Sequence, residues 1–412
     1  MRKLSKLALA ALSVLAVSNL ASCGPKADIT LVLAGPADWE EMNLDLIEAF
    51  KADRAASGDT KTYDIQYVHY GENDVDSKVL NWKEGPDVYA FASDKIGELY
   101  KKGALAKLAG LNEKFVEDNM TSFAVEVSSF ADGVYAYPMT ADNTYYTQYD
   151  ASQLSAAQVE NIEDMLDAAH ELGKKVAYNL PEAFWGGAAM FTFGADYEIN
   201  YDADGNVTST TADFDSPAGV KAAKAIYKIL SHPAWTKDTA DPDAIACLDG
   251  TWAISGESGY KAKWGANYAC AVMPKVTVDG ETKNLGAFVG CKLLGVNPQR
   301  STTDQQRLVA AHQLAQFLTG AQSQLTRYQV KGNVPCHNTA LEDPDLASDP
   351  NVLTLNAQHA FAHAQTPVPG AFWTAPGQLV QSMLSTDPAF EATETAFQQL
   401  CDTMNASIES AK

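Results

Sequence analysis

The sequence predicts an α/β protein built as two lobes, and three observations support that fold class. After residue 28, stretches with the features of strands alternate with amphipathic helical stretches, which is typical of a parallel sheet covered by helices. The chain has 412 residues, more than one typical hydrophobic core accommodates, so two lobes of ordinary domain size are expected. Hydrophobic residues make up 46% of the chain, which excludes a disordered protein.

The first part of the predicted fold alternates strands with helices. Gly35 and Pro36 end an apolar strand. Leu44, Ile47 and Phe50 then recur at the spacing of one helix face. The predicted elements of this part are strands 29–34, 63–70 and 88–92 and helices 43–56 and 96–102.

Longer helices and two hairpins are predicted for the rest of the chain. Ser216 is a candidate N-cap residue, followed by Pro217 at the first helical position. Thr303 is a candidate cap of a later helix. Asp-Gly dipeptides at 204–205 and 279–280 are typical of hairpin turns. The predicted elements are helices 160–172, 217–230, 304–318, 350–363 and 388–408 and hairpins 201–208 and 276–283.

The N-terminus has the features of a lipoprotein signal peptide covering residues 1–22. Three basic residues precede an apolar run at 7–17 that is too short to span a bilayer as a helix. The sequence Leu-Ala-Ser-Cys at 20–23 then resembles a bacterial lipobox. We therefore expect lipidation of Cys23, and a chain anchored to the cell membrane on its extracellular or periplasmic side.

The net charge of the chain restricts the classes of partner that it can bind. The formal net charge is −22, and removing residues 1–22, which carry three positive charges and no negative ones, takes it to −25. Such an acidic surface repels nucleic acid and anionic lipid headgroups. The expected partner is a neutral or cationic solute, or another protein.

The cysteines point to neither a metal site nor a redox site. Five follow Cys23, widely spread, and none belongs to a CxxC or Cys/His cluster. We expect buried small apolar side chains, with at most one or two disulfides that spacing cannot assign. The five are Cys247, Cys270, Cys291, Cys336 and Cys401.

Five short stretches occur in an order and at separations that are more specific than any one of them. They are residues 29–39, Gly-Pro-Asp-Val-Tyr-Ala-Phe-Ala-Ser-Asp-Lys at 85–95, Ala-Tyr-Pro-Met at 136–139, Gly-Thr-Trp-Ala at 250–253 and Gly-Ala-Phe-Trp at 370–373. On these stretches the chain resembles the extracellular solute-binding proteins of ABC transporters, in the maltose-binding-protein-like group (family 1) that binds sugars. The likeness spans nearly the whole mature chain.

The resemblance implies a two-lobe periplasmic-binding-protein-like fold of type II, with the ligand in the cleft between the lobes. Hinge closure around a solute is the motion of such proteins. Because the chain of such a fold crosses the hinge more than once, we expect an N-terminal lobe of residues 28–140 and 291–332. Residues 141–290 and 333–412 are then expected to form the C-terminal lobe.

The resemblance also implies a set of ligand-binding residues. Trp252 and Trp373 match two tryptophans that stack on the sugar, and Asp142 matches a carboxylate at the hinge. Where maltose binders carry an Arg four residues beyond the second tryptophan, this chain has Gly377, which leaves the exact sugar open. The full expected set is Asp38 and Trp39 in the first loop, Phe91, Asp94 and Lys95 at the third strand, Asp142, Glu182 with Phe184 or Trp185, Trp252 and Trp373.

These residue types suit a sugar. The face of a pyranose carries C–H groups that pack on aromatic rings, and its edge carries hydroxyls from which a carboxylate accepts hydrogen bonds in pairs.

Two other patterns in the sequence are weaker indications of a binding site. His359 and His363 have the spacing of a two-His metal motif on a helix, but no third ligand is evident. Residues 202–206 resemble a calcium loop, but a hairpin turn explains them better.

The sequence therefore predicts a lipid-anchored protein that binds an oligosaccharide, with maltose or a maltodextrin as the expected ligand, and delivers it to an ABC permease. The transporter ATPase is an indirect partner, the chain is expected to be a monomer, and no catalytic residue, cofactor or metal is needed. Two alternatives stay open. One is a binding protein of the same fold for a different oligosaccharide, and the other is a surface glycoside hydrolase that uses two of the same carboxylates.

Overall fold

The computed structural model describes residues 26–71, 75, 85–301, 303–368 and 370–411. The signal peptide and Cys23 therefore lie outside the described residues. The strands are β1 (Ile29–Gly35), β2 (Tyr63–His69), β3 (Val88–Ala92), β4 (Ser129–Phe130), β5 (Gly133–Val134), β6 (Tyr137–Asp150), β7 (Lys175–Tyr178), β8 (Tyr197–Tyr201), β9 (Val207–Ala212), β10 (Trp235–Thr236), β11 (Ala244–Gly250), β12 (Tyr268–Ala271), β13 (Lys275–Val278), β14 (Glu281–Asn284), β15 (Phe288–Val296) and β16 (His363–Ala364).

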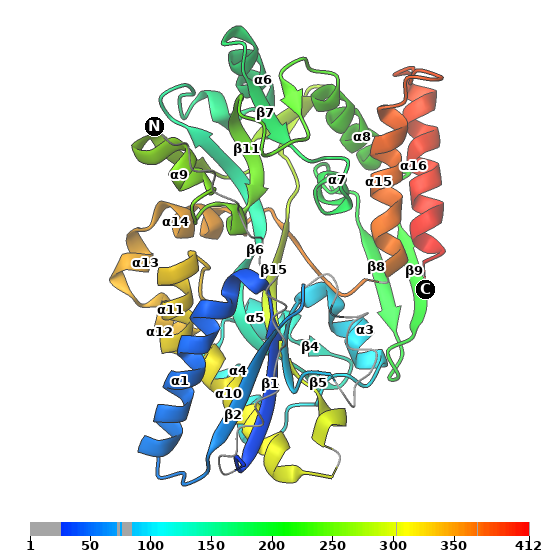
Figure 1. Cartoon of the computed structure of the whole chain (residues 1–412). Coiled ribbons are helices and arrows are strands. Elements are labelled where there is room, and N and C mark those ends of the chain that lie inside the picture. Colours follow the sequence, from blue (N-terminus) through cyan, green and yellow to red (C-terminus); the bar gives the residue numbers. More distant parts are fainter. Residues whose placement is uncertain (1–25, 72–74, 76–84, 302, 369, 412) are drawn as a thin grey trace, which may run out of the picture.

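Helices cover both halves of the molecule (Figure 1). They are α1 (Glu40–Ala56), α3 (Ile96–Lys101), α4 (Leu111–Asn119), α5 (Ser122–Val127), α6 (Ile162–Glu171), α7 (Ala183–Ala189), α8 (Pro217–Leu230), α9 (Tyr260–Trp264), α10 (Gln305–Thr319), α11 (Ala321–Lys331), α12 (Asn338–Leu341), α13 (Pro344–Ser348), α14 (Pro350–Gln358), α15 (Ala375–Met383) and α16 (Glu394–Glu409). Three short 3-10 turns matter for the site: η2 (Ser93–Lys95), η4 (Thr251–Ala253) and η7 (Gly370–Thr374).

One sheet runs through both lobes. Among the described residues its strand order is β10-β7-β11-β6-β15-β3-β1-β2, with β12 added to β6 and β16 to β15. The first half of β6 pairs with β15, from Tyr137 opposite Leu294 to Thr144 opposite Val289. Its second half pairs with β11, beginning with Tyr145 opposite Gly250. Strands β6 and β15 thus connect the lower lobe of Figure 1 to the upper one.

The predicted α/β two-lobe fold is confirmed, but the sheet is mixed rather than parallel. The pairs β1–β2, β1–β3 and β7–β11 are parallel, as the alternation of strands and helices predicts. Strand β15 instead runs antiparallel to both β3 and β6, and β6 runs antiparallel to β11. The mixture arises because β15 lies between β3 and β6 and runs opposite to both.

Each lobe has its own hydrophobic core. The lower core lies between strands β1 and β3 and the helices α1 and α10, and it includes Phe50, Phe91 and Leu314. The upper core joins α6, α8, α15 and α16 and includes Phe214 and Phe288. The lobe boundaries expected from the sequence remain a proposal. The membership of the two cores supports them, except that Ala141 and Cys336 pack with the lower core.

Most predicted elements appear within a few residues of their expected bounds. Strand β3 and helix α8 have the predicted bounds, and the Ser216 side chain caps α8 by accepting a hydrogen bond from Gly219 N. Both predicted hairpins are present, as β8–β9 and β13–β14. The Asp202 carboxylate accepts hydrogen bonds within the first of these turns, as expected for a hairpin rather than a calcium loop.

Three helix ends were predicted wrongly. Asp304, not Thr303, caps α10 through Arg307 N. Helix α14 ends at Gln358, because the following residues turn back and His363 pairs with Phe288 at the edge of β15. The two histidines expected on one helix face are therefore not on one helix. Helix α16 begins at Glu394 rather than at Pro388.

The five cysteines after Cys23 are free. All are buried except Cys270, which is half-buried, so the expectation of small buried side chains holds without a disulfide. Within the described ranges no helix is long and apolar enough to cross a membrane.

The buried histidine of α10 should make stability depend on pH. His312 Nδ1 lies 2.9 Å from the Tyr137 hydroxyl oxygen, and burial lowers the pKa of His312 to about 4. The unfolded state, with a pKa near 6.5, binds more protons between those values, so stability is present above about pH 6.5 and is lost as pH falls toward 4. The titration of His312 is expected to lower the free energy of unfolding by about 3 kcal/mol over this range.

Urea unfolding of wild type and His312→Gln at pH 4.5 and 7.5 measures this dependence. The variant should be less stable at pH 7.5 but should lose less stability on acidification, since glutamine does not titrate. Parallel pH dependences of the two proteins would contradict the prediction.

Candidate ligand-binding site

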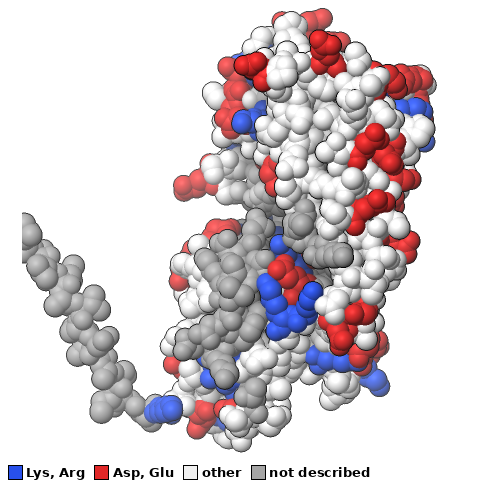
Figure 2. All heavy atoms as spheres, turned by 90° about the vertical axis from the view of Figure 1, so that its right-hand side faces the viewer, with Lys and Arg blue, Asp and Glu red and all other residues white. Residues whose placement is uncertain are grey.

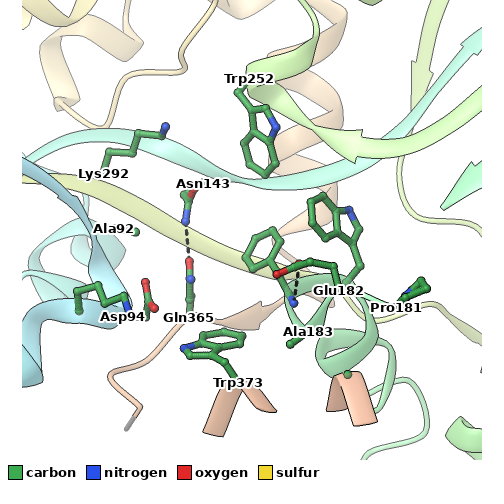
Figure 3. Close-up of a pocket in the computed structure, with 14 residues that line it drawn as sticks. Ala92, Asp94, Asn143, Pro181, Glu182, Ala183, Trp252, Lys292, Gln365 and Trp373 are labelled. Atoms are coloured by element: carbon green, nitrogen blue, oxygen red, sulfur yellow. Dashed lines mark hydrogen bonds between the residues drawn. The ribbon is translucent and has the colours of Figure 1, made fainter. Parts of the chain in front are cut away.

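A cavity of about 800 Å³ lies where the two lobes face each other (Figure 3). Its volume falls within the range of small-molecule sites, roughly 300–1,000 Å³. Both connecting strands and loops of both lobes contribute to it. The lining residues are Ala92, Asp94, Lys95, Asn143, Pro181, Glu182, Ala183, Phe184, Trp185, Trp252, Lys292, Gln365, Trp373 and Gly377.

Aromatic side chains of the upper lobe form one wall of the cavity. The ring centroid of Trp252 lies 6.1 Å from that of Phe184 and 6.3 Å from that of Trp185. Trp373 lies at the other end of this wall, where it faces Trp252 across the cavity (Figure 3), and packs edge-on against Phe288 at 5.5 Å. Trp252 is 43% exposed, a large exposure for a tryptophan, whereas Trp373 is half-buried. The wall thus presents flat apolar surface to a ligand.

Local structure explains how these rings reach the cavity. The Glu182 carboxylate accepts a hydrogen bond from Phe184 N at 3.0 Å and so caps α7. The first turn of that helix carries Phe184 and Trp185. Burial raises the pKa of Glu182. Trp252 lies in η4 directly after β11, and Trp373 lies in η7 directly before α15.

Polar side chains of the connecting strands and the lower lobe form the opposite wall. Asp94 and Lys95 come from η2, and Lys292 comes from β15. Between the walls, Asn143 Nδ2 donates a 2.6 Å hydrogen bond to Gln365 Oε1 (Figure 3). In the space-filling view, basic and acidic side chains gather at mid-height, while acidic ones are spread over the face (Figure 2). The site therefore combines aromatic surface with hydrogen-bonding groups.

Seven of the residues expected from the sequence line this cavity, and four do not. The seven are Asp94, Lys95, Glu182, Phe184, Trp185, Trp252 and Trp373. The other four are Asp38, Trp39, Phe91 and Asp142.

Phe91, and Trp39 and Asp38 in the first loop, make contacts within the protein or at its surface and do not reach the cavity. Phe91 is fully buried in the lower core, 5.8 Å from Tyr89 between ring centroids. Trp39 is 5% exposed, with Lys292 Nζ 5.3 Å and the Arg327 guanidinium 5.5 Å from its ring centroid. Trp39 thus supports Lys292 through a cation–π contact. Asp38 lies outside the cavity, where its backbone oxygen accepts a hydrogen bond from Lys331.

Asp142 is buried at the point where β6 passes between the lobes. Its Oδ2 accepts hydrogen bonds from Asn333 Nδ2 at 3.1 Å and from Val334 N at 2.9 Å. Its backbone oxygen accepts a 2.6 Å hydrogen bond from Thr251 Oγ1. Burial raises the pKa of this carboxyl. Asp142 therefore ties the connecting strand to its neighbours, while the next residue, Asn143, lines the cavity.

Sequence reasoning missed three polar lining residues. Asn143 directly follows the predicted Asp142, and because neighbouring strand residues face opposite sides, the error is one residue along β6. Lys292 is the one charged residue in a nine-residue buried strand, a signal that could have identified it. Gln365 follows the two-residue strand β16 and carried no comparable signal.

Metal binding has no support within the described part of the chain, where no group of three or more His, Cys, Asp or Glu residues is placed to hold an ion. His363 packs its ring on Phe191, 3.8 Å between centroids, and lies 2.9 Å from Asp196 Oδ1. Its contacts differ from those of a metal pair with His359.

The fold and the interlobe cavity define a two-lobe binding protein, and comparisons with known proteins give its family. Residues 45–354 match the family described as bacterial extracellular solute-binding protein, and the chain belongs to that family. A galactooligosaccharide-binding protein of Bacillus subtilis (strain 168) is 21% identical over 341 residues, which cover 77% of each chain.

Solved structures share the fold at low sequence identity. A maltodextrin-binding protein of L. casei BL23, solved without ligand, is 20% identical with a TM-score of 0.77, over 93% of this chain and 99% of that one. A maltotriose-binding protein of Thermus thermophilus is 18% identical with a TM-score of 0.70, over 92% and 99% of the two chains. The family is one of solute-binding proteins, which makes the chain a binding protein rather than a glycoside hydrolase.

Proposed function

We propose that this protein is the oligosaccharide-binding component of an ABC importer, and that it takes up its ligand in the interlobe cavity and delivers it to the permease. The observation that carries the proposal is the pairing of aromatic rings on one wall with carboxylate, amide and ammonium groups on the other. This pairing suits a neutral polyhydroxylated ligand better than an apolar or purely ionic one.

The chemistry of the two walls gives each a role. Trp252 and Trp373 offer ring faces to the C–H face of a pyranose, and burial of that contact supplies affinity. Glu182, beside these rings, and Asn143 and Gln365, between the walls, offer acceptors and donors to the hydroxyls and so orient the ligand. Because the walls belong to different lobes, a ligand that touches both favours the closed arrangement.

Maltose or a maltodextrin remains the proposed ligand, with a different oligosaccharide as the alternative. Structural neighbours named for maltodextrin and maltotriose support the first, and the relative named for galactooligosaccharides supports the second. The position of Gly377 in the cavity wall bears on this choice. A glycine at this position offers a ligand neither a charge nor a side-chain donor.

Titration calorimetry of the purified protein with maltose, maltotriose, trehalose, raffinose, xylobiose and a galactooligosaccharide tests the proposal. Saturable binding of maltose or maltotriose, strongest in the series, is the expected result. Strongest binding of another oligosaccharide would keep the transport function and replace the ligand. Absence of binding to every sugar in the series would contradict the oligosaccharide proposal.

The proposal also includes the anchor and the assembly state. The Leu-Ala-Ser-Cys sequence at 20–23 supports a diacylglyceryl group on Cys23, which would hold the protein at the outer side of the cell membrane. A tethered receptor stays close to its permease, which raises its effective concentration there. We propose that it acts as a monomer, since one chain supplies both walls of the cavity.

Replacing the anchoring cysteine should abolish membrane attachment. In Cys23→Ala no thiol remains to accept the lipid, so the protein should stay unprocessed or be released. Metabolic labelling with a fatty-acid analogue, followed by fractionation, measures both effects. Cys401→Ala is the control, since a buried thiol far along the chain should leave labelling unchanged. Labelled Cys23→Ala protein would refute lipidation at this residue.

A further inference from the structure

The exposed indole ring of Trp252 rests on the backbone of Gly250, two residues earlier. A Cβ atom added to Gly250 would come under 3.0 Å from three carbons of the six-membered ring, Cε2, Cζ2 and Cη2. Real Cβ atoms essentially never approach so closely. The backbone of Gly250, with φ −71° and ψ 158°, is open to any residue. The glycine is therefore required by the ring above it and not by its own conformation.

Thr251, which lies between Gly250 and Trp252, attaches the turn η4 to the connecting strand β6. Thr251 is 4% exposed, and its Oγ1 donates a 2.6 Å hydrogen bond to the backbone oxygen of Asp142. The Asp142 carboxylate is itself held by Asn333 and Val334. Gly250 N donates to Asp249 Oδ1 at 2.7 Å, which fixes the end of β11.

We infer that Gly250 and Thr251 are positioning residues for the ligand platform made by Trp252. Gly250 supplies the bare surface on which the ring lies, and Thr251 holds the turn against β6, beside the cavity residue Asn143. The inference rests on the proposed function, because it assigns these residues a role in oligosaccharide binding. It predicts that neither residue touches the ligand and that both act through the ring.

Gly250→Ala should displace the ring and weaken binding of the sugar that wild type binds best. A displaced ring keeps part of its contact, so we expect about tenfold weaker affinity, a smaller loss than from Trp252→Ala. The unfolding midpoint should change little, since alanine fits this backbone conformation and the displaced ring is already 43% exposed. Gly320→Ala is the matched control. Gly320 also precedes a helix, with φ −67° and ψ 163°, and a Cβ there would make ordinary contacts at 3.4 Å.

A double-mutant cycle separates positioning from a general structural effect. If Gly250 acts only through the ring, Gly250→Ala should change affinity no further in a Trp252→Ala background. Fluorine NMR of 5-fluorotryptophan-labelled protein gives a readout without ligand. The resonance of Trp252, identified by its loss in Trp252→Phe, should shift in Gly250→Ala and stay in place in Gly320→Ala.

The role of Thr251 is tested by a conservative pair. Thr251→Val keeps the shape of the side chain but removes the hydroxyl donor, and should weaken sugar binding. Thr251→Ser keeps the donor and should bind sugar with nearly the affinity of wild type. Equal affinities of the two variants would overturn the role of Thr251.

The outcomes distinguish this inference from the proposed function. If wild type binds no sugar of the calorimetric series, the proposed function fails, and the fluorine spectra still decide whether Gly250 seats the ring. If wild type binds and Trp252→Ala loses affinity, a Gly250→Ala affinity within about threefold of wild type overturns the inference. An additive double-mutant cycle overturns it as well.

Discussion

Trp252→Ala and Trp373→Ala should each weaken oligosaccharide binding by about thirtyfold or more. Truncation of an aromatic anchor commonly costs about 2 kcal/mol or more of binding free energy, which corresponds to that loss. Both rings line the interlobe cavity. Each substitution therefore removes contact area that becomes fully desolvated only in the complex. Titration calorimetry measures the loss directly.

The two variants should differ in stability. Trp252 is 43% exposed, and its removal should shift the unfolding midpoint little. Trp373 packs against Phe288 and Phe372, so its removal should lower stability more. Trp264 is the control: it lies outside the cavity, is 9% exposed and stacks on Tyr260 at 5.1 Å. Trp264→Ala should lose about 3–5 kcal/mol of stability yet bind sugar normally at temperatures where it is folded. Normal binding by Trp252→Ala or Trp373→Ala would remove that residue from the site.

Arg307→Met should destabilise the lower lobe by about 3 kcal/mol, at the lower end of the range for breaking a buried ion pair. Arg307 Nε and Nη2 lie 2.6 and 2.8 Å from the two carboxylate oxygens of Asp87. Asp87 is 1% exposed and also accepts a hydrogen bond from Val32 N at 2.8 Å. The variant leaves this carboxylate buried without its main partner. Arg300 Nε, 3.9 Å from Asp87 Oδ1, limits the loss.

Urea unfolding measures this effect, and two further variants test its cause. Asp87→Asn combined with Arg307→Met should recover part of the loss, because no buried charge remains. Lys174→Met breaks an ion pair with Asp243 whose side chains are 34% and 57% exposed, and should change the free energy of unfolding little, because solvent screens such a pair. A cost for Arg307→Met no greater than that of Lys174→Met would contradict the prediction.

The pair also explains why a short sequence motif was informative. Asp87 belongs to the Gly-Pro-Asp-Val stretch on which the family resemblance partly rests. Its carboxylate links β1, through Val32, to the first turn of α10, 220 residues away. The stretch thus stabilises the lower lobe and positions η2, whose Asp94 and Lys95 reach the cavity.

The sequence by itself determined the elements whose signals are local, together with most of the aromatic wall. Strand β3 is a continuous apolar run, and α8 has its cap, its proline and its apolar face within 15 residues, so neighbouring residues suffice to define both. Trp252 and Trp373 were identifiable because they stand in short recognisable stretches.

The tertiary structure alone decided that Asn143 and Gln365 line the cavity and that β6 divides between two partner strands. The 14 residues of β6 form one strand because β15 covers its first half and β11 its second, partners that lie more than 90 residues away in the sequence. Strand alternation then sends Asn143 into the cavity and Asp142 into the hinge, and no local pattern distinguishes the two faces of a strand buried on both sides. Gln365 reaches Asn143 across 222 residues, because His363 pairs with the start of β15 and ends the preceding helix early. A binding site assembled from distant segments depends on strand register, and register is fixed only when the partner strands meet.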